Sequence, residues 1–96
     1  MSPSNKKKLN VIRIKLDKLD NKFLSLIKSR TGLVKEVLKL KEFRKEIVDQ
    51  KRINFILNKI KQKSKKLKID PKITNRIWKN MIWSYIDFER RNFKKK

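Results

Sequence analysis

Residues 23–37 read FLSLIKSRTGLVKEV, and their pattern predicts a helix that buries one side. Apolar residues in and around this stretch recur at alternating spacings of three and four, which is the period of one stripe along an α-helix. This apolar stripe consists of Leu19, Phe23, Leu26, Leu33, Val37 and Leu40. The place that the stripe requires between Leu26 and Leu33 is taken by Arg30. A guanidinium on a buried face needs either a carboxylate to pair with or an anion to bind.

Few residues in the chain interrupt helices, because Gly32 is the only glycine and Pro3 and Pro71 are the only prolines. We therefore expect an all-α fold with one long helix and two shorter ones. The expected helices run from about Lys8 to about Phe43, from about Gln50 to Lys66, and from Asp70–Pro71 to about Phe93. The polar tracts at residues 44–46 and 61–68, and the basic tails at residues 6–8 and 94–96, are expected to be solvated or frayed.

Two aspartates mark the expected starts of the shorter helices. Asp49 and Asp70 are suitable N-caps, and Pro71 suits the first turn of the third helix. The inward faces are expected to be apolar. They comprise Ile53, Ile56, Leu57 and Ile60 in the second helix, and Ile77, Trp78, Met81, Ile82, Tyr85 and Phe88 in the third.

The first helix is too long for a small globule. It would extend roughly 50 Å at about 1.5 Å per residue. A chain of 96 residues is also near the lower limit at which one hydrophobic core suffices, so a second copy is a natural source of further core. We expect a single domain over residues 1–96, with its core in about residues 9–93.

The composition excludes several kinds of site. The chain has no cysteine and no histidine, so it has no disulfide, no thiolate metal site and no histidine-dependent nucleophile. No apolar run approaches the ~20 residues of a membrane span, and the start MSPSNKKKLN lacks the apolar stretch of a secretory signal. A cytoplasmic location without membrane contact is expected.

Three further charged residues are notable for their positions in the helical pattern. Lys41 follows Arg30 by eleven residues, which returns to within about 20° of the same helix face. Arg13 precedes Arg30 by seventeen residues and is rotated by roughly 100°, so it suits the pocket of a partner better than that of its own chain. Glu89 follows Tyr85 by four residues on the inward face of the third helix, where a carboxyl group must be paired or protonated.

These residues, in their order and spacing, resemble the all-helical (type II) class of chorismate mutases. The resemblance covers about residues 9–93. It rests on Arg13, Leu19–Asp20, Arg30, Leu33–Val37, Lys41, Asp49, Arg52, Asp70 and Glu89. It implies an intertwined homodimer with two active sites, each lined by both chains. It also implies an isomerase that converts chorismate to prephenate, a pericyclic reaction that needs no cofactor, metal or nucleophile.

The resemblance also implies roles for individual residues. Arg30 and the partner subunit's Arg13 would grip the two carboxylates of chorismate. Lys41 would bridge a carboxylate and the ether oxygen, and Arg52 would add positive potential at the pocket wall. Glu89 would contact the ether oxygen as a protonated acid, at a position where many members have glutamine.

The resemblance also concerns three other positions. The neighbourhood of Asp49 would contact substrate partly through the backbone, which is compatible with its N-cap role. Ile53 stands where typical mutases of this class have a glutamate, and Tyr85 stands where they have a small hydroxyl residue. Both resemble the related isochorismate-pyruvate lyases, which form salicylate and pyruvate, although those lyases usually carry glutamine at the position of Glu89. Mutase is the favoured interpretation and lyase is the alternative.

A third interpretation follows from the charge. The chain has 30 Lys and Arg residues against 9 Asp and Glu, a net charge of +21, which would attract nucleic acid. A helical nucleic-acid-binding protein, however, has no use for Arg30 on a buried stripe or for Glu89 among aromatic residues. Nor do aromatic residues alternate with the basic clusters to stack on bases. We therefore expect chorismate and a second copy of the chain as partners, with nucleic acid bound only non-specifically.

Overall fold

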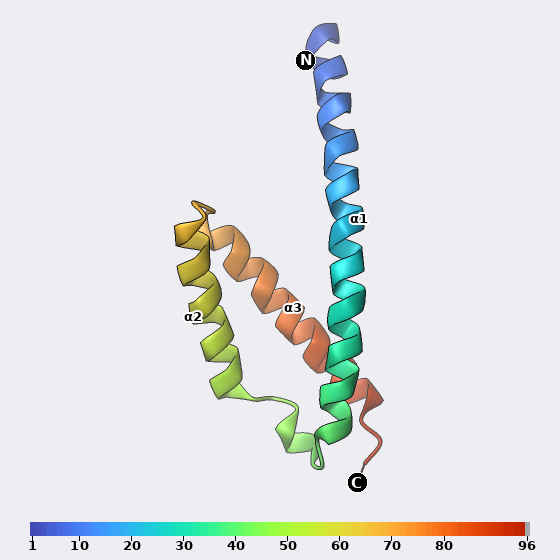
Figure 1. The fold of residues 1–96 in the computed structure, drawn as a ribbon, viewed down its shortest axis with the longest axis vertical. Coiled ribbons are helices and arrows are strands. Elements are labelled where there is room, and N and C mark those ends of the chain that lie inside the picture. Colours follow the sequence, from blue (N-terminus) through green and yellow to red (C-terminus); the bar gives the residue numbers. More distant parts are fainter. Residues whose placement is uncertain (96) are drawn as a thin grey trace. The chain divides into compact units, whose positions relative to one another are not determined.

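The computed structural model describes residues 1–95, and none of these residues lies in a β-strand. Three α-helices and one short 3₁₀ helix follow one another along the chain (Figure 1). They are α1 (Pro3–Leu40), η1 (Arg44–Glu46), α2 (Gln50–Lys66) and α3 (Pro71–Asn92). The helices α1, α2 and α3 contain 38, 17 and 22 residues, so the expected all-α fold with one long and two shorter helices is confirmed.

The chain divides into two compact units. The first is Met1–Leu33, which consists almost wholly of the first part of α1. The second begins at Val34 and contains the last turns of α1 together with η1, α2 and α3. Each unit is described by itself below.

Helix α1 begins earlier and ends earlier than its sequence pattern predicts. It starts at Pro3 rather than near Lys8, because the Ser2 hydroxyl accepts a hydrogen bond from the Asn5 N–H at 3.1 Å and so caps the helix. Residues 6–8 are therefore helical, and the prediction that they fray was wrong. At the other end α1 stops at Leu40, before the predicted Phe43.

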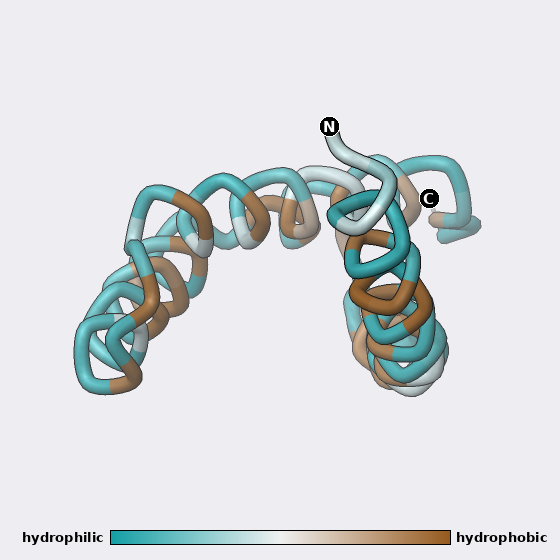
Figure 2. Tube along the Cα trace, turned by 90° about the horizontal axis from the view of Figure 1, so that it is seen from above, coloured by the Kyte–Doolittle hydropathy of each residue, from teal (hydrophilic) through white to brown (hydrophobic). Residues whose placement is uncertain are grey.

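The apolar stripe of α1 is not covered within one chain. Helix α1 contains no buried residue, and the six stripe residues are all exposed, from Phe23 at 47% to Leu40 at 80%. Arg30 itself is half-buried. Figure 2 shows hydrophobic segments recurring between hydrophilic ones along the helices. Among the described helices, none is long and apolar enough to cross a membrane.

The segment between α1 and α2 is anchored to the end of α3. In η1, the Arg44 guanidinium donates a hydrogen bond to the Arg90 carbonyl at 3.2 Å. The same guanidinium lies 5.5 Å from the centroid of the Phe93 ring, close enough for a cation–π contact. A polar stretch that the sequence pattern marks only as an interruption thus forms a specific link.

Helices α2 and α3 pack against each other and are joined by a tight turn (Figure 1). Both aspartate caps form as predicted. The Asp49 carboxylate accepts from the Arg52 N–H at 3.0 Å, and the Asp70 carboxylate accepts from the Lys72 N–H at 2.9 Å. Helix α2 has the predicted bounds, and α3 begins at the predicted Pro71.

The turn between α2 and α3 contains two features that were not predicted. Lys68 adopts a left-handed backbone conformation with φ of 56°, and Ile69 N–H donates to the Ser64 carbonyl at 2.9 Å, as in a Schellman C-cap. Ser64, placed by the sequence pattern in a solvated tract, is 97% buried. Its hydroxyl lies 2.7 Å from that of Thr74, which links α2 to α3.

The core of the second unit lies between α2 and α3. It also includes residues from the end of α1 and from the segment that joins α1 to α2. Its buried apolar residues are Ile47, Ile53, Ile82, Ile86 and Phe93, with Leu38, Val48, Ile56 and Leu57 packed around them. The predicted inward face of α3 needs a correction. Ile86 is buried although it was not predicted, and Ile77 is 40% exposed although it was. The centre of the inward face therefore follows Ile82, Ile86, Glu89 and Phe93, and Glu89 lies on it.

Candidate active site

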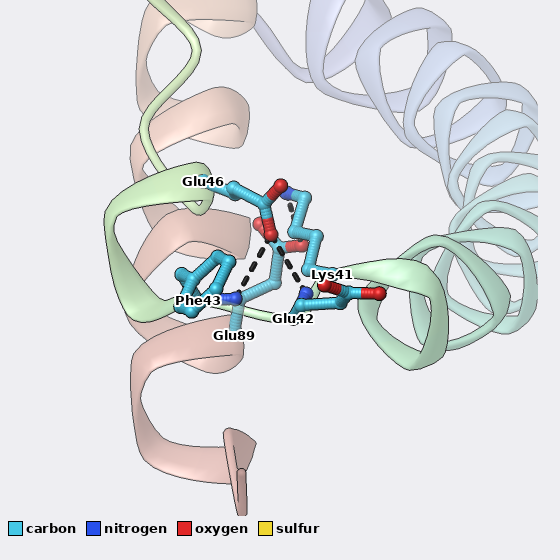
Figure 3. A network of polar contacts seen from close by, with 5 residues as sticks. All are labelled: Lys41, Glu42, Phe43, Glu46 and Glu89. Atoms are coloured by element: carbon cyan, nitrogen blue, oxygen red, sulfur yellow. Dashed lines mark hydrogen bonds and ion pairs between the residues drawn. The ribbon is translucent and has the colours of Figure 1, made fainter. Parts of the chain in front are cut away.

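Lys41 and Glu89 form a largely buried charged pair in the second unit, whereas the Arg91–Asp87 pair on α3 is exposed. The Lys41 Nζ atom lies 2.9 Å from Glu89 Oε1 (Figure 3), within range of a charge-assisted hydrogen bond. The Lys41 side chain is 18% exposed and the Glu89 side chain 7%. An unpaired carboxylate at this depth would be costly, so Lys41 offsets the burial of Glu89. Of the two states predicted for Glu89, the structure shows the paired one.

The backbone around Lys41 is held on both sides. The Lys41 N–H donates to the Leu38 carbonyl at 3.2 Å, which closes the last turn of α1. Beyond Lys41, the Glu46 Oε2 atom accepts from the N–H groups of Glu42 and Phe43 at 2.7 and 2.9 Å (Figure 3). Lys41 is thus presented by a short, hydrogen-bonded turn and not by a loose loop.

The environment of Glu46 favours its ionised form. Its pKa is lowered from 4.5, first by the hydrogen bond from the Phe43 N–H and then by that from the Glu42 N–H. Desolvation raises the pKa by a smaller amount, and the positive charges of Lys45 and Lys41 lower it by still smaller ones. Glu46 was not among the predicted site residues. The sequence does contain a signal for this role. Glu46 follows Phe43, the N-cap of η1, by three residues, which is the spacing of a capping box.

A hollow of about 520 Å³ adjoins Lys41. Its lining comes from the end of α1, the segment after it and the start of α2. The residues are Val37, Leu40, Lys41, Glu46, Val48, Asp49, Gln50 and Lys51. The hollow therefore combines apolar side chains with two ammonium groups, two carboxylates and the start of α2, whose helix dipole favours an anion. Such a lining suits a small anion with an apolar body.

The two acidic groups in this lining are already engaged with the backbone. Asp49 caps α2 through the Arg52 N–H, and Glu46 caps the turn after Lys41. Their negative charge is therefore partly compensated by N–H dipoles. Lys41 and Lys51 remain as the ammonium groups around the hollow.

Arg52, predicted at the pocket wall, is not among the residues that line this hollow. Its guanidinium lies 5.4 Å from the centroid of the Phe55 ring, and the Lys59 Nζ atom lies 5.3 Å from the same ring. Phe55 is 53% exposed. The Arg52 guanidinium thus lies over the Phe55 ring of α2, a contact that the helical pattern of the sequence does not predict.

Ile53 and Tyr85, which were predicted to bind substrate, lie away from the hollow beside Lys41. Ile53 is 7% exposed and belongs to the core shared with Ile82 and Ile86. Tyr85 is half-buried on α3, one helical turn before Glu89. Neither residue lines the hollow beside Lys41.

Arg13 and Arg30 belong to the first unit. Both lie on α1, where Arg13 is exposed and Arg30 is half-buried. Within the second unit, Lys41 contacts Glu89 and lines the hollow together with Asp49, whereas Glu89 is not among the residues that line it.

No group of three or more acidic, cysteine or histidine side chains in the described part of the chain is arranged to hold a metal ion. The polar side chains around the hollow are two ammonium groups, Lys41 and Lys51, and two carboxylates, Glu46 and Asp49, that accept backbone hydrogen bonds. With a buried carboxyl group 2.9 Å from one ammonium, the arrangement can hold an anionic ligand and exchange hydrogen bonds with it.

Comparisons with known proteins identify the family. The family model for chorismate mutase type II matches residues 12–90. A chorismate mutase of Methanocaldococcus jannaschii is 36% identical over 76 residues, which span 78% of this chain and 77% of that protein. No solved structure matches the chain significantly.

Proposed function

Because this chain belongs to the chorismate mutase type II family, we propose that it converts chorismate to prephenate at a site built around Lys41 and Glu89. It is accordingly an isomerase. The observation that carries the choice of site is the 2.9 Å contact between Lys41 Nζ and Glu89 Oε1, beside a hollow with apolar walls. These are the two groups that the family resemblance assigns to the ether oxygen of the substrate.

The reaction sets simple chemical requirements. In chorismate the bond between the ether oxygen and the ring breaks while a carbon–carbon bond forms, and negative charge develops on that oxygen. An enzyme accelerates this step by holding the folded conformer of the substrate and by placing hydrogen-bond donors at the oxygen. The Lys41 ammonium is mostly shielded from water, so its positive charge is less screened there than at the surface.

Substrate binding requires Lys41 and Glu89 to exchange partners. Without substrate, the Glu89 carboxylate accepts the hydrogen bond of Lys41. In the complex, Lys41 donates to a substrate carboxylate and to the ether oxygen. Glu89 can donate to that oxygen only when it carries a proton. An ionised Glu89 would repel both the substrate and the charge that forms during the reaction.

The remaining contacts need a second copy of the chain. The apolar stripe of α1 is exposed in one chain and offers a surface for this copy. In the resulting homodimer, Arg30 and the partner subunit's Arg13 grip the two carboxylates of chorismate, and Arg52 supplies positive potential from α2. Bidentate pairing of guanidinium with carboxylate would fix the substrate in its reactive conformer.

Product analysis tests the function directly. The purified protein is incubated separately with chorismate and with isochorismate, and the products are identified. We expect prephenate from chorismate. Salicylate and pyruvate from isochorismate, at a higher kcat/KM than the mutase reaction, would instead favour the lyase alternative suggested by Ile53 and Tyr85.

A further inference from the structure

The turn that carries Lys41 is closed by a side chain of its own. Glu46 lies five residues after Lys41, and one oxygen, Oε2, accepts from both N–H groups that directly follow Lys41, those of Glu42 and Phe43. The Glu46 N–H in turn donates to the Phe43 carbonyl at 3.0 Å. Figure 3 shows the two hydrogen bonds that Glu46 Oε2 accepts, and together with the backbone bond they order residues 42–46.

The same turn is attached to the part of α3 that carries Glu89. Arg44 donates to the carbonyl of Arg90, the residue next to Glu89, and packs over the Phe93 ring. The turn therefore has two kinds of support. Arg44 fixes it to α3, and Glu46 fixes the direction in which the chain leaves Lys41.

A direct role of Glu46 in binding an anion is unfavourable. Glu46 lines the hollow beside Lys41, where a carboxylate free to act would repel a dianionic substrate. Its oxygen instead accepts two backbone N–H groups, which partly compensate its charge. The presence of a carboxylate at position 46 is thus explained by the hydrogen bonds that it accepts from the backbone next to Lys41.

We propose that Glu46 is a positioning residue of the mutase site: its carboxylate orders the turn after Lys41 and so directs the Lys41 ammonium toward Glu89 and the substrate. This inference rests on the proposed function and adds a residue that makes no contact with the reacting atoms. Misplacement of a catalytic group by about 1 Å can reduce a rate by about 100-fold, so a small shift of Lys41 would be measurable.

A kinetic double-mutant cycle tests whether Glu46 acts through Lys41. Glu46→Ala should lower kcat by about 10-fold or more and change KM by less than about 3-fold, because Lys41 acts mainly in the transition state. In a Lys41→Met background, Glu46→Ala should change kcat/KM by less than about 2-fold. An equal fold-change in both backgrounds would mean that Glu46 does not act through Lys41.

Two further variants separate positioning from charge. Glu46→Gln keeps an oxygen that can accept both N–H groups and should remain within about 3-fold of the wild-type kcat. Glu46→Asp is one methylene shorter and should behave like Glu46→Ala. Ser64→Ala serves as a control, because it removes the hydroxyl contact with Thr74 and lowers stability without changing kcat/KM of the folded protein.

Unfolding experiments give a readout that does not depend on activity. The coupling between Lys41 and Glu89 is measured in urea from Lys41→Met, Glu89→Gln and the double variant, first with Glu46 present and then in the Glu46→Ala background. At least half of the coupling should be lost in that background. An unchanged coupling would overturn the positioning role, whatever the activity. Failure to form prephenate while the coupling still depends on Glu46 would overturn only the proposed function.

Discussion

Arg30 interrupts the apolar stripe of α1 and is half-buried there. Lysine is abundant on the surface of this chain, whose net charge is +21, so a single positive charge has little influence on the overall potential. A guanidinium differs from an ammonium in its planar pair of donors, which matches a carboxylate. The proposed role of Arg30 therefore depends on geometry more than on charge.

A charge-preserving substitution tests this role. Arg30→Lys should reduce kcat/KM by about 100-fold or more, on the order of 2.7 kcal/mol, because the two-pronged grip is lost. Arg76→Lys is the matched control, since Arg76 is exposed on α3 and makes no proposed contact with substrate. Similar small effects of the two substitutions on kcat/KM would show that substrate binding depends on the overall positive charge and not on the geometry of Arg30.

Glu89 can serve the ether oxygen of the substrate only as a hydrogen-bond donor, because an ionised carboxylate only accepts hydrogen bonds and carries the same sign of charge as the substrate. Glu89→Gln supplies a permanent donor of similar shape, so it should preserve or raise kcat/KM at pH 8. Glu89→Ala supplies no donor and should be less active. If Glu89→Gln is as inactive as Glu89→Ala in steady-state kinetics, Glu89 is not the donor.

At the scale of secondary structure, the two turns of the second unit are held in different ways. The turn after α2 uses backbone hydrogen bonds and forces Lys68 into a left-handed conformation. The turn after α1 uses the Glu46 side chain as an acceptor. Glycine substitution at Lys68 should therefore change the stability of the turn after α2, whereas pH should change the stability of the turn after α1.

Lys68→Gly should stabilise the protein. Glycine adopts positive φ without the steric cost that Lys68 incurs, and we expect a gain of about 0.5–1 kcal/mol in the free energy of unfolding. The matched control is Lys61→Gly, an exposed site inside α2, which should lose about 1 kcal/mol. Urea unfolding of both variants measures the difference. A loss at Lys68 would contradict the assigned cap.

Glu46 should contribute stability that depends on pH. Because its folded-state pKa lies below 4.5, its contribution is fully present above that pH and is lost as the pH falls through the folded-state pKa. Glu46→Ala should therefore lower Tm at pH 7, and the difference from wild type should shrink at strongly acidic pH. Glu36→Ala, at an exposed position of α1, should show no such dependence. Melting curves from pH 3 to 7 provide the test.

At the scale of the whole molecule, the exposed stripe of α1 predicts assembly. A protein whose folding is coupled to dimer formation should appear as a dimer in light scattering at micromolar concentration, and its Tm should rise with concentration. Leu26→Lys places a charge on the stripe and should favour the monomer and reduce activity. Leu24→Lys changes an equally apolar, exposed residue outside the stripe and should leave the dimer intact. A stable, active monomer would exclude a contribution from the partner subunit's Arg13.

Several features of the fold could be predicted because they depend on residues close together in the chain. Asp49 and Asp70 cap helices through N–H groups only three and two residues away, so their side chains and positions suffice to identify them. The early start of α1 has the same kind of cause, a cap by Ser2 before Pro3, but that signal was overlooked. The burial of Ser64 could not be read from its lysine-rich surroundings, because it depends on Thr74 of the next helix.

The three helices, the inward position of Glu89 and the functional groups available could be derived from the amino-acid sequence, because helical period, capping and side-chain composition are local properties. The cation that Glu89 contacts depends on the folding of the chain. Its partner, Lys41, is 48 residues away in the chain, and their 2.9 Å contact requires both the packing around α3 and the turn that Glu46 closes. No periodic pattern specifies the path of such a turn, since that path results from hydrogen bonds that exist only once the chain has folded.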